Sequence, residues 1–139
     1  MENTKETLEN RRVKSFVIRA GRMTKAQITA LETLSPKYLV DVAELKELDF
    51  DAIFNRKAPL VVEIGFGMGK SFVQMAKDDP NSNYLGIEVH PPGVGAAMML
   101  VEQEGLTNVK IIKYDAFEIL TKCIAKESID ILQIFFPDP

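Results

Sequence analysis

The sequence is poor in residues that could cross-link the chain. Its 139 residues include one cysteine, one histidine and no tryptophan. A single cysteine, Cys123, cannot form a disulfide within the chain, and with one histidine it cannot supply the four ligands of a structural zinc site. We therefore expect neither a disulfide-rich secreted domain nor a metal site, and the composition fits the reducing cytoplasm.

Long apolar runs are also missing. No segment approaches the roughly 20 apolar residues that a membrane-spanning helix needs. The N-terminus has no apolar signal-peptide core, and Glu2, Glu6 and Glu9 argue against an organelle transit peptide. We expect no membrane partner and a cytoplasmic protein. With 46% hydrophobic and 27% charged residues, the chain has the composition and length of one small globular domain.

Charge is distributed unevenly along the chain. Residues 1–25 carry seven basic and three acidic side chains, a net charge of +4, whereas the whole chain has −3 and the remainder therefore −7. Six of the basic residues lie in residues 11–25, which contain no acid. This segment is either a contact for an anionic partner or a solvated tail.

Regular structure is predicted from Pro59 onward, where short β-branched runs alternate with amphipathic stretches. This alternation is typical of an α/β fold with a parallel sheet and right-handed crossovers. We expect two parts, an irregular and partly disordered basic arm over 1–58, with one short helix near 50–55, and a sheet domain over 59–139. The predicted strands are 60–65, 83–89, 108–114 and 128–136, and the predicted helices are 70–79, 91–104 and 116–124.

A glycine-rich loop, EIGFGMG over residues 63–69, ends the first predicted strand. Gly65, Gly67 and Gly69 allow a tight turn and a close approach to a ligand. The dinucleotide fingerprint G-x-G-x-x-G has its third glycine one residue later, so this spacing disfavours an NAD site.

Carboxylates stand at the ends of all four predicted strands, where ligands bind in open parallel sheets. Glu88 suits the two hydroxyls of a ribose because a carboxylate offers acceptors only, although a solvated strand end is the alternative. Glu63 would contact a cationic amino-acid group or brace the loop. Asp115 would cap the next helix and also contact an adenine amino group.

The last five residues, FFPDP, hold Asp138 between two prolines that fix the local backbone. The apolar residues Ile131, Leu132 and Ile134 are expected to anchor this string on a buried strand. The alternative is a simple proline-rich chain end.

These motifs together resemble the bacterial tRNA (guanine-N7)-methyltransferase family. The strings VVEIGFGMGKS, YLGIEVHPPGVGA, YDAFEIL and FFPDP occur in the order and spacing of that family, and RVKSFVIRAGRMTKAQ resembles the segment before its catalytic domain. The resemblance implies a Rossmann-like class I methyltransferase sheet that uses S-adenosylmethionine. It implies methyl transfer to N7 of a guanine in the variable loop of tRNA.

The resemblance also assigns roles to residues. Cofactor contacts would come from Glu63, Glu88 and Asp115, together with Gly65 and Gly67 of the loop. Asp138 would lie beside the methyl group and the guanine, both as a cofactor contact and as the catalytic residue. No metal is implied, and the protein is expected to be a monomer or a homodimer.

Members of this family continue beyond the FFPDP string. We therefore expect a sheet truncated after about four strands, with an exposed edge and little activity in the chain alone. The competing hypotheses are a non-enzymatic module that binds the cofactor, a methyltransferase acting on an amino nitrogen, and, last, an NAD oxidoreductase.

Overall fold

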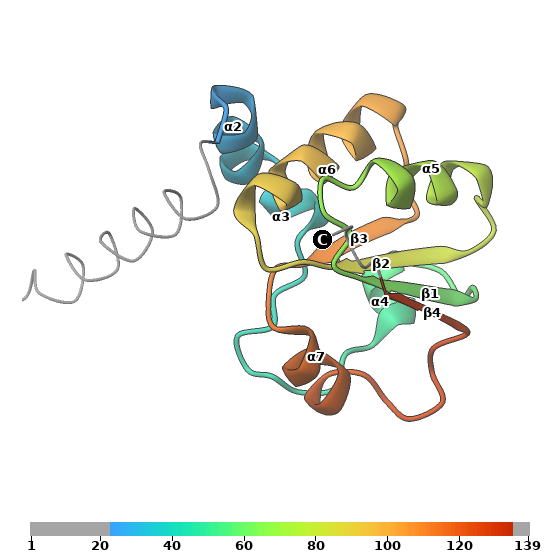
Figure 1. The fold of residues 1–139 in the computed structure, drawn as a ribbon. Coiled ribbons are helices and arrows are strands. Elements are labelled where there is room, and N and C mark those ends of the chain that lie inside the picture. Colours follow the sequence, from blue (N-terminus) through green and yellow to red (C-terminus); the bar gives the residue numbers. More distant parts are fainter. Residues whose placement is uncertain (1–22, 135–139) are drawn as a thin grey trace, which may run out of the picture.

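A computed structural model describes residues 23–134 of the chain. Its centre is a parallel sheet with the strand order β3-β2-β1-β4 (Figure 1). The strands are β1 (Leu60–Ile64), β2 (Asn83–Ile87), β3 (Val109–Ile112) and β4 (Ile131–Ile134). The helices are α2 (Lys25–Thr33), α3 (Ser35–Tyr38), α4 (Phe50–Phe54), α5 (Lys70–Asp78), α6 (Pro91–Glu104) and α7 (Ala116–Lys122).

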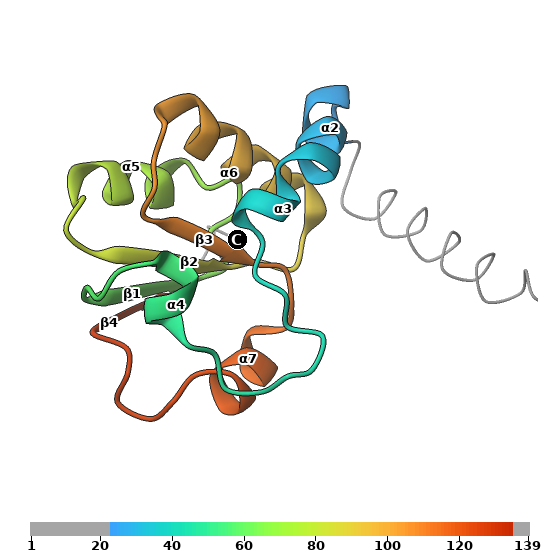
Figure 2. The ribbon, with the colours of Figure 1, turned by 180° about the vertical axis from the view of Figure 1, so that it is seen from behind.

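Helices cover both faces of the sheet, as Figures 1 and 2 show. One core contains Val61 of β1 together with side chains of α3, α5 and α6. The other contains Val62, the next residue of β1, with side chains of α4 and α7 and the buried thiol of Cys123. Successive residues of β1 point to opposite faces of the sheet, so the apolar run of this strand contributes side chains to both cores. The predicted α/β class is confirmed.

The helix ends follow the local sequence signals. Pro91 and Pro92 occupy the first positions of α6, where a missing backbone N–H leaves no hydrogen bond unmade. Gly105 ends the same helix in the left-handed conformation, with φ of 63°. The predicted short helix near 50–55 is also present, as α4.

Residues 25–38 differ from the predicted irregular arm because they form α2 and α3. A reciprocal capping box begins α2, since Thr24 Oγ1 accepts from the Gln27 backbone N–H and Gln27 Oε1 accepts from that of Thr24, both at 3.1 Å. The helix packs along α6, so tertiary contacts stabilise a helix that its weak apolar pattern does not predict. The segment after α3 then joins the sheet edge, where Val40 N–H donates to the Ile111 carbonyl at 2.9 Å.

Strand β4 corrects one expectation. Ile131, Leu132 and Ile134 were predicted to lie on a buried strand, but they are 52, 47 and 50% exposed. Within residues 23–134, β4 pairs only with β1, so it is an edge strand of the described sheet. Residues 128–130 of the predicted strand are irregular, and its last two residues lie, with all of residues 135–139, outside the described residues. Residues 1–22 of the predicted, partly disordered arm also lie outside them.

Asn108 links the turns at the amino edge of the sheet. Its side-chain Nδ2 donates to the carbonyls of Ala76, Asp79 and Ser82 at 3.0, 3.2 and 3.1 Å. The residue is buried, and each of these carbonyls also accepts one other hydrogen bond, from Asp79 N–H, Ser82 N–H and Arg56 Nη2 respectively.

We predict that Asn108→Asp lowers the free energy of unfolding by about 1–3 kcal/mol, because a carboxylate of the same shape offers no N–H donor to the three carbonyls. Urea denaturation at pH 7 measures this loss. The exposed Asn81 provides the matched control, since Asn81→Asp should change stability little. Equal effects of the two substitutions would contradict the prediction.

Candidate functional site

The glycine loop joins β1 to α5 at the carboxyl edge of the sheet. Its first glycine, Gly65, donates its backbone N–H to the Ile87 carbonyl of β2 at 2.8 Å, which holds the loop across two strands. Gly65, Gly67 and Gly69 have φ of 71, 64 and 85°, a region that disfavours residues with a Cβ. The glycine spacing seen in the sequence thus corresponds to three residues with left-handed backbone conformation.

The loop also packs tightly against α6. A Cβ at Gly93 would lie 2.1 Å from the Gly67 carbonyl oxygen, and one at Gly69 would lie 2.5 Å from Ala97 Cβ. Gly93 is not among the site residues predicted from the sequence. The available signal was a glycine just after the two prolines that begin a helix, where glycine lowers helix propensity and implies a close contact.

Glu88 follows β2 and organises the backbone around it. Its Oε1 accepts from Gly67 N–H at 2.9 Å, and its Oε2 accepts from the backbone N–H of Val89 at 2.8 Å and of His90 at 3.3 Å. A carboxylate has about four acceptor sites, so one site on Oε1 remains. Glu88 is only 7% exposed and connects the glycine loop to the turn that precedes α6.

Glu63 is the second buried acid at this edge, at 7% exposure. It shares a face of β1 with Val61, the face that α5 and α6 cover. Within residues 23–134, no group donates a hydrogen bond to its carboxylate. Burial raises the pKa of Glu63 above the ordinary value of 4.5, because desolvation disfavours the ionised form.

Asp115 lies at the end of β3, on the same edge of the sheet. It is the N-cap of α7, and its Oδ1 accepts from Glu118 N–H at 3.0 Å, which confirms the predicted capping role. A hydrogen bond therefore joins the glycine loop directly to Glu88. Glu63 and Asp115 lie at the carboxyl ends of β1 and β3, the strands on either side of β2. Asp138 lies outside the described residues.

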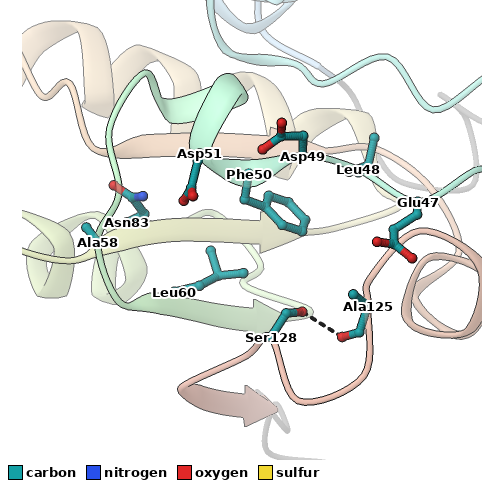
Figure 3. Close-up of a pocket in the computed structure, with 10 residues that line it drawn as sticks. All are labelled: Glu47, Leu48, Asp49, Phe50, Asp51, Ala58, Leu60, Asn83, Ala125 and Ser128. Carbon is teal, nitrogen blue, oxygen red and sulfur yellow. Dashed lines mark hydrogen bonds between the residues drawn. The ribbon is translucent and has the colours of Figure 1, made fainter.

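A cavity of about 420 Å³ lies at the opposite, amino-terminal edge of the sheet (Figure 3). Leu60 and Asn83, the first residues of β1 and β2, contribute to its wall, and Glu47, Asp49 and Asp51 surround it with carboxylates. Its position separates it from the glycine loop. In the part of the chain that the structure describes, no group of three or more His, Cys, Asp or Glu residues is arranged to hold a metal ion.

No helix within residues 23–134 is long and apolar enough to cross a membrane.

We predict that Glu88→Gln lowers the free energy of unfolding by about 1–3 kcal/mol, because the glutamine NH₂ would face backbone N–H groups that now donate to a carboxylate. Thermal denaturation measures the loss, and amide exchange at Gly67 should accelerate with it. The exposed Glu32 on α2 is the control, since Glu32→Gln should change neither measurement. Slow exchange at Gly67 in Glu88→Gln would contradict this account.

Glu63→Gln should have the opposite effect on stability. The pKa of Glu63 is higher in the folded protein than in the unfolded chain, so the unfolded chain ionises first as the pH rises. The fold therefore loses stability as the pH rises from the unfolded pKa through the folded pKa, whereas below both values the carboxyl is neutral in both states. Glu63→Gln should therefore be more stable than the parent at pH 7, with the difference shrinking towards pH 4. Denaturation midpoints measured across this range provide the check, and a difference independent of pH would refute the assignment.

The sequence of the chain matches a known protein family. Residues 57–139 match the model of a family described as putative methyltransferase. Two solved structures share the fold, an antibiotic-related methyltransferase and a 30S ribosomal A1408 methyltransferase from an uncultured bacterium. The first has a TM-score of 0.51 and 21% identity, over 68% of this chain and 51% of that one. The second has a TM-score of 0.50 and 24% identity, over 66% and 46%.

Curated relatives are more similar in sequence. The tRNA (guanine-N(7)-)-methyltransferases of Hydrogenovibrio crunogenus and Psychromonas ingrahamii are each 50% identical over 129 residues, 93% of this chain and 53% of theirs. That of Escherichia coli O139:H28 is 52% identical over 129 residues, 93% of this chain and 54% of its own. The chain spans about half the length of the curated relatives it matches. The family resemblance inferred from the sequence motifs is confirmed. Because the family model covers more than half of the residues of the chain, the chain belongs to the putative methyltransferase family.

Proposed function

We propose that this protein is a tRNA (guanine-N7-)-methyltransferase that uses S-adenosylmethionine. The observation that carries the proposal is its 50–52% identity, over 93% of the chain, to curated proteins of that name. The function would be the transfer of a methyl group to N7 of a guanine in the variable loop of tRNA. A tRNA substrate favours the cytoplasm as the place where the protein works.

The residues at the carboxyl edge fit the cofactor. When bound, S-adenosylmethionine would supply the methyl group and the sulfonium from which it leaves. The remaining acceptor site on Glu88 Oε1 suits one ribose hydroxyl, while the other sites on the carboxylate hold the glycine loop in shape. The loop backbone, without a Cβ at Gly65 and Gly67, permits close approach of the ligand.

Glu63 fits the cationic amino group of the same ligand. A buried carboxylate without a hydrogen-bond donor is unfavourable alone, and an ammonium nearby would favour its ionised form. Ligand binding would therefore lower the pKa of Glu63 from its raised value. Asp115 is exposed at the end of β3 and retains a second carboxylate oxygen, which suits the adenine amino group.

The guanine N7 needs placement rather than deprotonation. Its in-plane lone pair carries no proton, so the protein has to align it with the methyl group, and no general base is required. Methylation leaves a cationic purine, which a fixed carboxylate would stabilise, and the same carboxylate could equally accept a hydrogen bond from the guanine edge. Asp138 suits this role because the prolines on both sides restrict its backbone. It also follows β4, whose carboxyl end lies beside that of β1.

The basic segment at residues 11–25 suits the phosphates of tRNA, and most of it lies outside the described residues. Contacts of this kind release counterions, so binding through them weakens steeply with added salt.

We predict that Asp138→Ala reduces methyl transfer to unmodified tRNA by about 10²–10³-fold, the typical loss when a group that stabilises transition-state charge is removed. The affinity for S-adenosylmethionine, measured by calorimetry, should change far less. Asp51→Ala, an exposed acid of α4, is the control and should leave methylation unchanged.

An equal loss of cofactor affinity in Asp138→Ala would assign Asp138 to cofactor binding alone. Little activity is expected of residues 1–139 alone, so the decisive assay uses this chain extended to the full length of its curated relatives. Protein of that length that binds the cofactor but leaves every tRNA unmodified would reject the proposed function.

A further inference from the structure

Two polar side chains without hydrogen-bond donors lie on neighbouring strands at the carboxyl edge of the sheet. Glu63 of β1 and Gln133 of β4 are register partners in a parallel pair, so their side chains leave the sheet on the same face (Figure 1). Gln133 Oε1 is buried and accepts no hydrogen bond within the described part of the chain. Glu63 is buried too, and no described group donates to its carboxylate. Both acceptors are unfavourable in the free protein, so a role in binding would explain them.

The position on the other side of Glu63 is apolar. Its register partner there is Gly86 of β2, and the ring of Phe66 covers that glycine, since a Cβ at Gly86 would lie 2.6 Å from Phe66 Cδ2. Phe66 is buried and stacks on Phe72, with ring centroids 5.3 Å apart. At this level β2, β1 and β4 therefore present an aromatic ring, a carboxylate and an amide, in that order, and the ring offers the carboxylate no donor.

An ammonium group fits this pair of acceptors. The carboxylate needs a positive charge and the amide oxygen needs an N–H donor, and an ammonium supplies both because it has three N–H groups. At N–H···O distances of about 2.9 Å, two acceptors on one tetrahedral nitrogen stand about 4.7 Å apart. Adjacent strands are about 4.8 Å apart, and glutamate and glutamine have the same length, so the two side-chain ends can share one nitrogen. A hydroxyl or a water molecule would leave the charge of Glu63 uncompensated.

We propose that Gln133 is a further cofactor-binding residue, an inference that rests on the proposed function. Its Oε1 accepts one N–H of the amino group of S-adenosylmethionine, and Glu63 compensates the charge of that group. Glu63 lies two residues before Gly65, so the amino-acid end of the ligand is held between β1 and β4, next to the glycine loop. Gln133 thereby favours ligands with a primary ammonium over nucleosides that lack one.

The test uses the protein extended to the full length of its curated relatives, as in the tRNA assay. Gln133→Met keeps the length of the side chain and removes the amide oxygen. It should weaken S-adenosylmethionine binding by about tenfold, the typical loss when a hydrogen bond to a charged group is removed, and calorimetry gives the affinities. Gln103→Met, at an exposed position of α6, is the matched control and should leave the affinity within about twofold.

Two further ligands separate a contact with the ammonium from a general change in the site. S-adenosylhomocysteine and 5′-methylthioadenosine share the nucleoside and a neutral thioether sulfur, but only the first carries the amino-acid group. Gln133→Met should weaken binding of S-adenosylhomocysteine by about tenfold and leave that of 5′-methylthioadenosine within about twofold. In the Glu63→Gln background the same substitution should weaken binding far less, because both side chains contact one group.

The stability of the free protein provides a readout without any ligand. Removing a buried oxygen that has no donor should leave the denaturation midpoint of Gln133→Met unchanged or higher, whereas a glutamine that only supports the fold would lower it. If Gln133→Met does not fold, Gln133→Asn keeps the amide but draws its oxygen back by one methylene, and it should show the same selective loss of binding.

The outcomes separate the two proposals. Unchanged affinity for S-adenosylhomocysteine in Gln133→Met, or equal weakening of both nucleosides with a lower denaturation midpoint, would overturn the role of Gln133 and leave the proposed function standing. A selective loss of S-adenosylhomocysteine binding in a protein that leaves every tRNA unmodified would reject the proposed function and retain the ammonium site.

Discussion

The close approach of the glycine loop to α6 is the constraint on which the rest of the site depends. The Gly67 carbonyl occupies the space that a side chain at position 93 would need, and the Gly67 N–H donates to Glu88. One residue, Gly67, is thus held from two sides, by packing at its carbonyl and by a charge-assisted hydrogen bond from its N–H. The geometry of the loop follows from these two contacts rather than from the glycines alone.

The two buried acids serve this edge in different ways. Glu88 has most of its acceptor sites occupied by backbone N–H groups, so its charge is compensated within the protein. Glu63 is equally buried but has no donor among the described residues, and its pKa is raised accordingly. In the proposed cofactor site, one compensated and one uncompensated acid would suit a ligand with one positive group, at some cost in the stability of the free protein.

Much of the site could be predicted because it depends on local rules. Glycine at three alternate positions predicts turns that only glycine adopts readily, and an aspartate before an amphipathic stretch predicts an N-cap, as Asp115 proved to be. Parallel strands share their carboxyl edge, so the sequence also predicted that Glu63, Glu88 and Asp115 would gather there. The roles of these residues, and that of Asp138, remain predictions.

The sequence by itself determined the α/β class, the order and approximate positions of the strands and helices from residue 60 onward, and the place of Glu63, Glu88 and Asp115 at the carboxyl edge of the sheet. Each follows from periodicity, turn chemistry or chain connectivity. Only the tertiary structure decided that residues 25–38 are helical, that β4, with Ile131, Leu132 and Ile134, is an exposed edge of the described sheet, and that Gly93 and Gly95 face different partners. These features depend on contacts between residues far apart in the chain, such as Gln27 with Gly95, and no local pattern encodes which segments will meet.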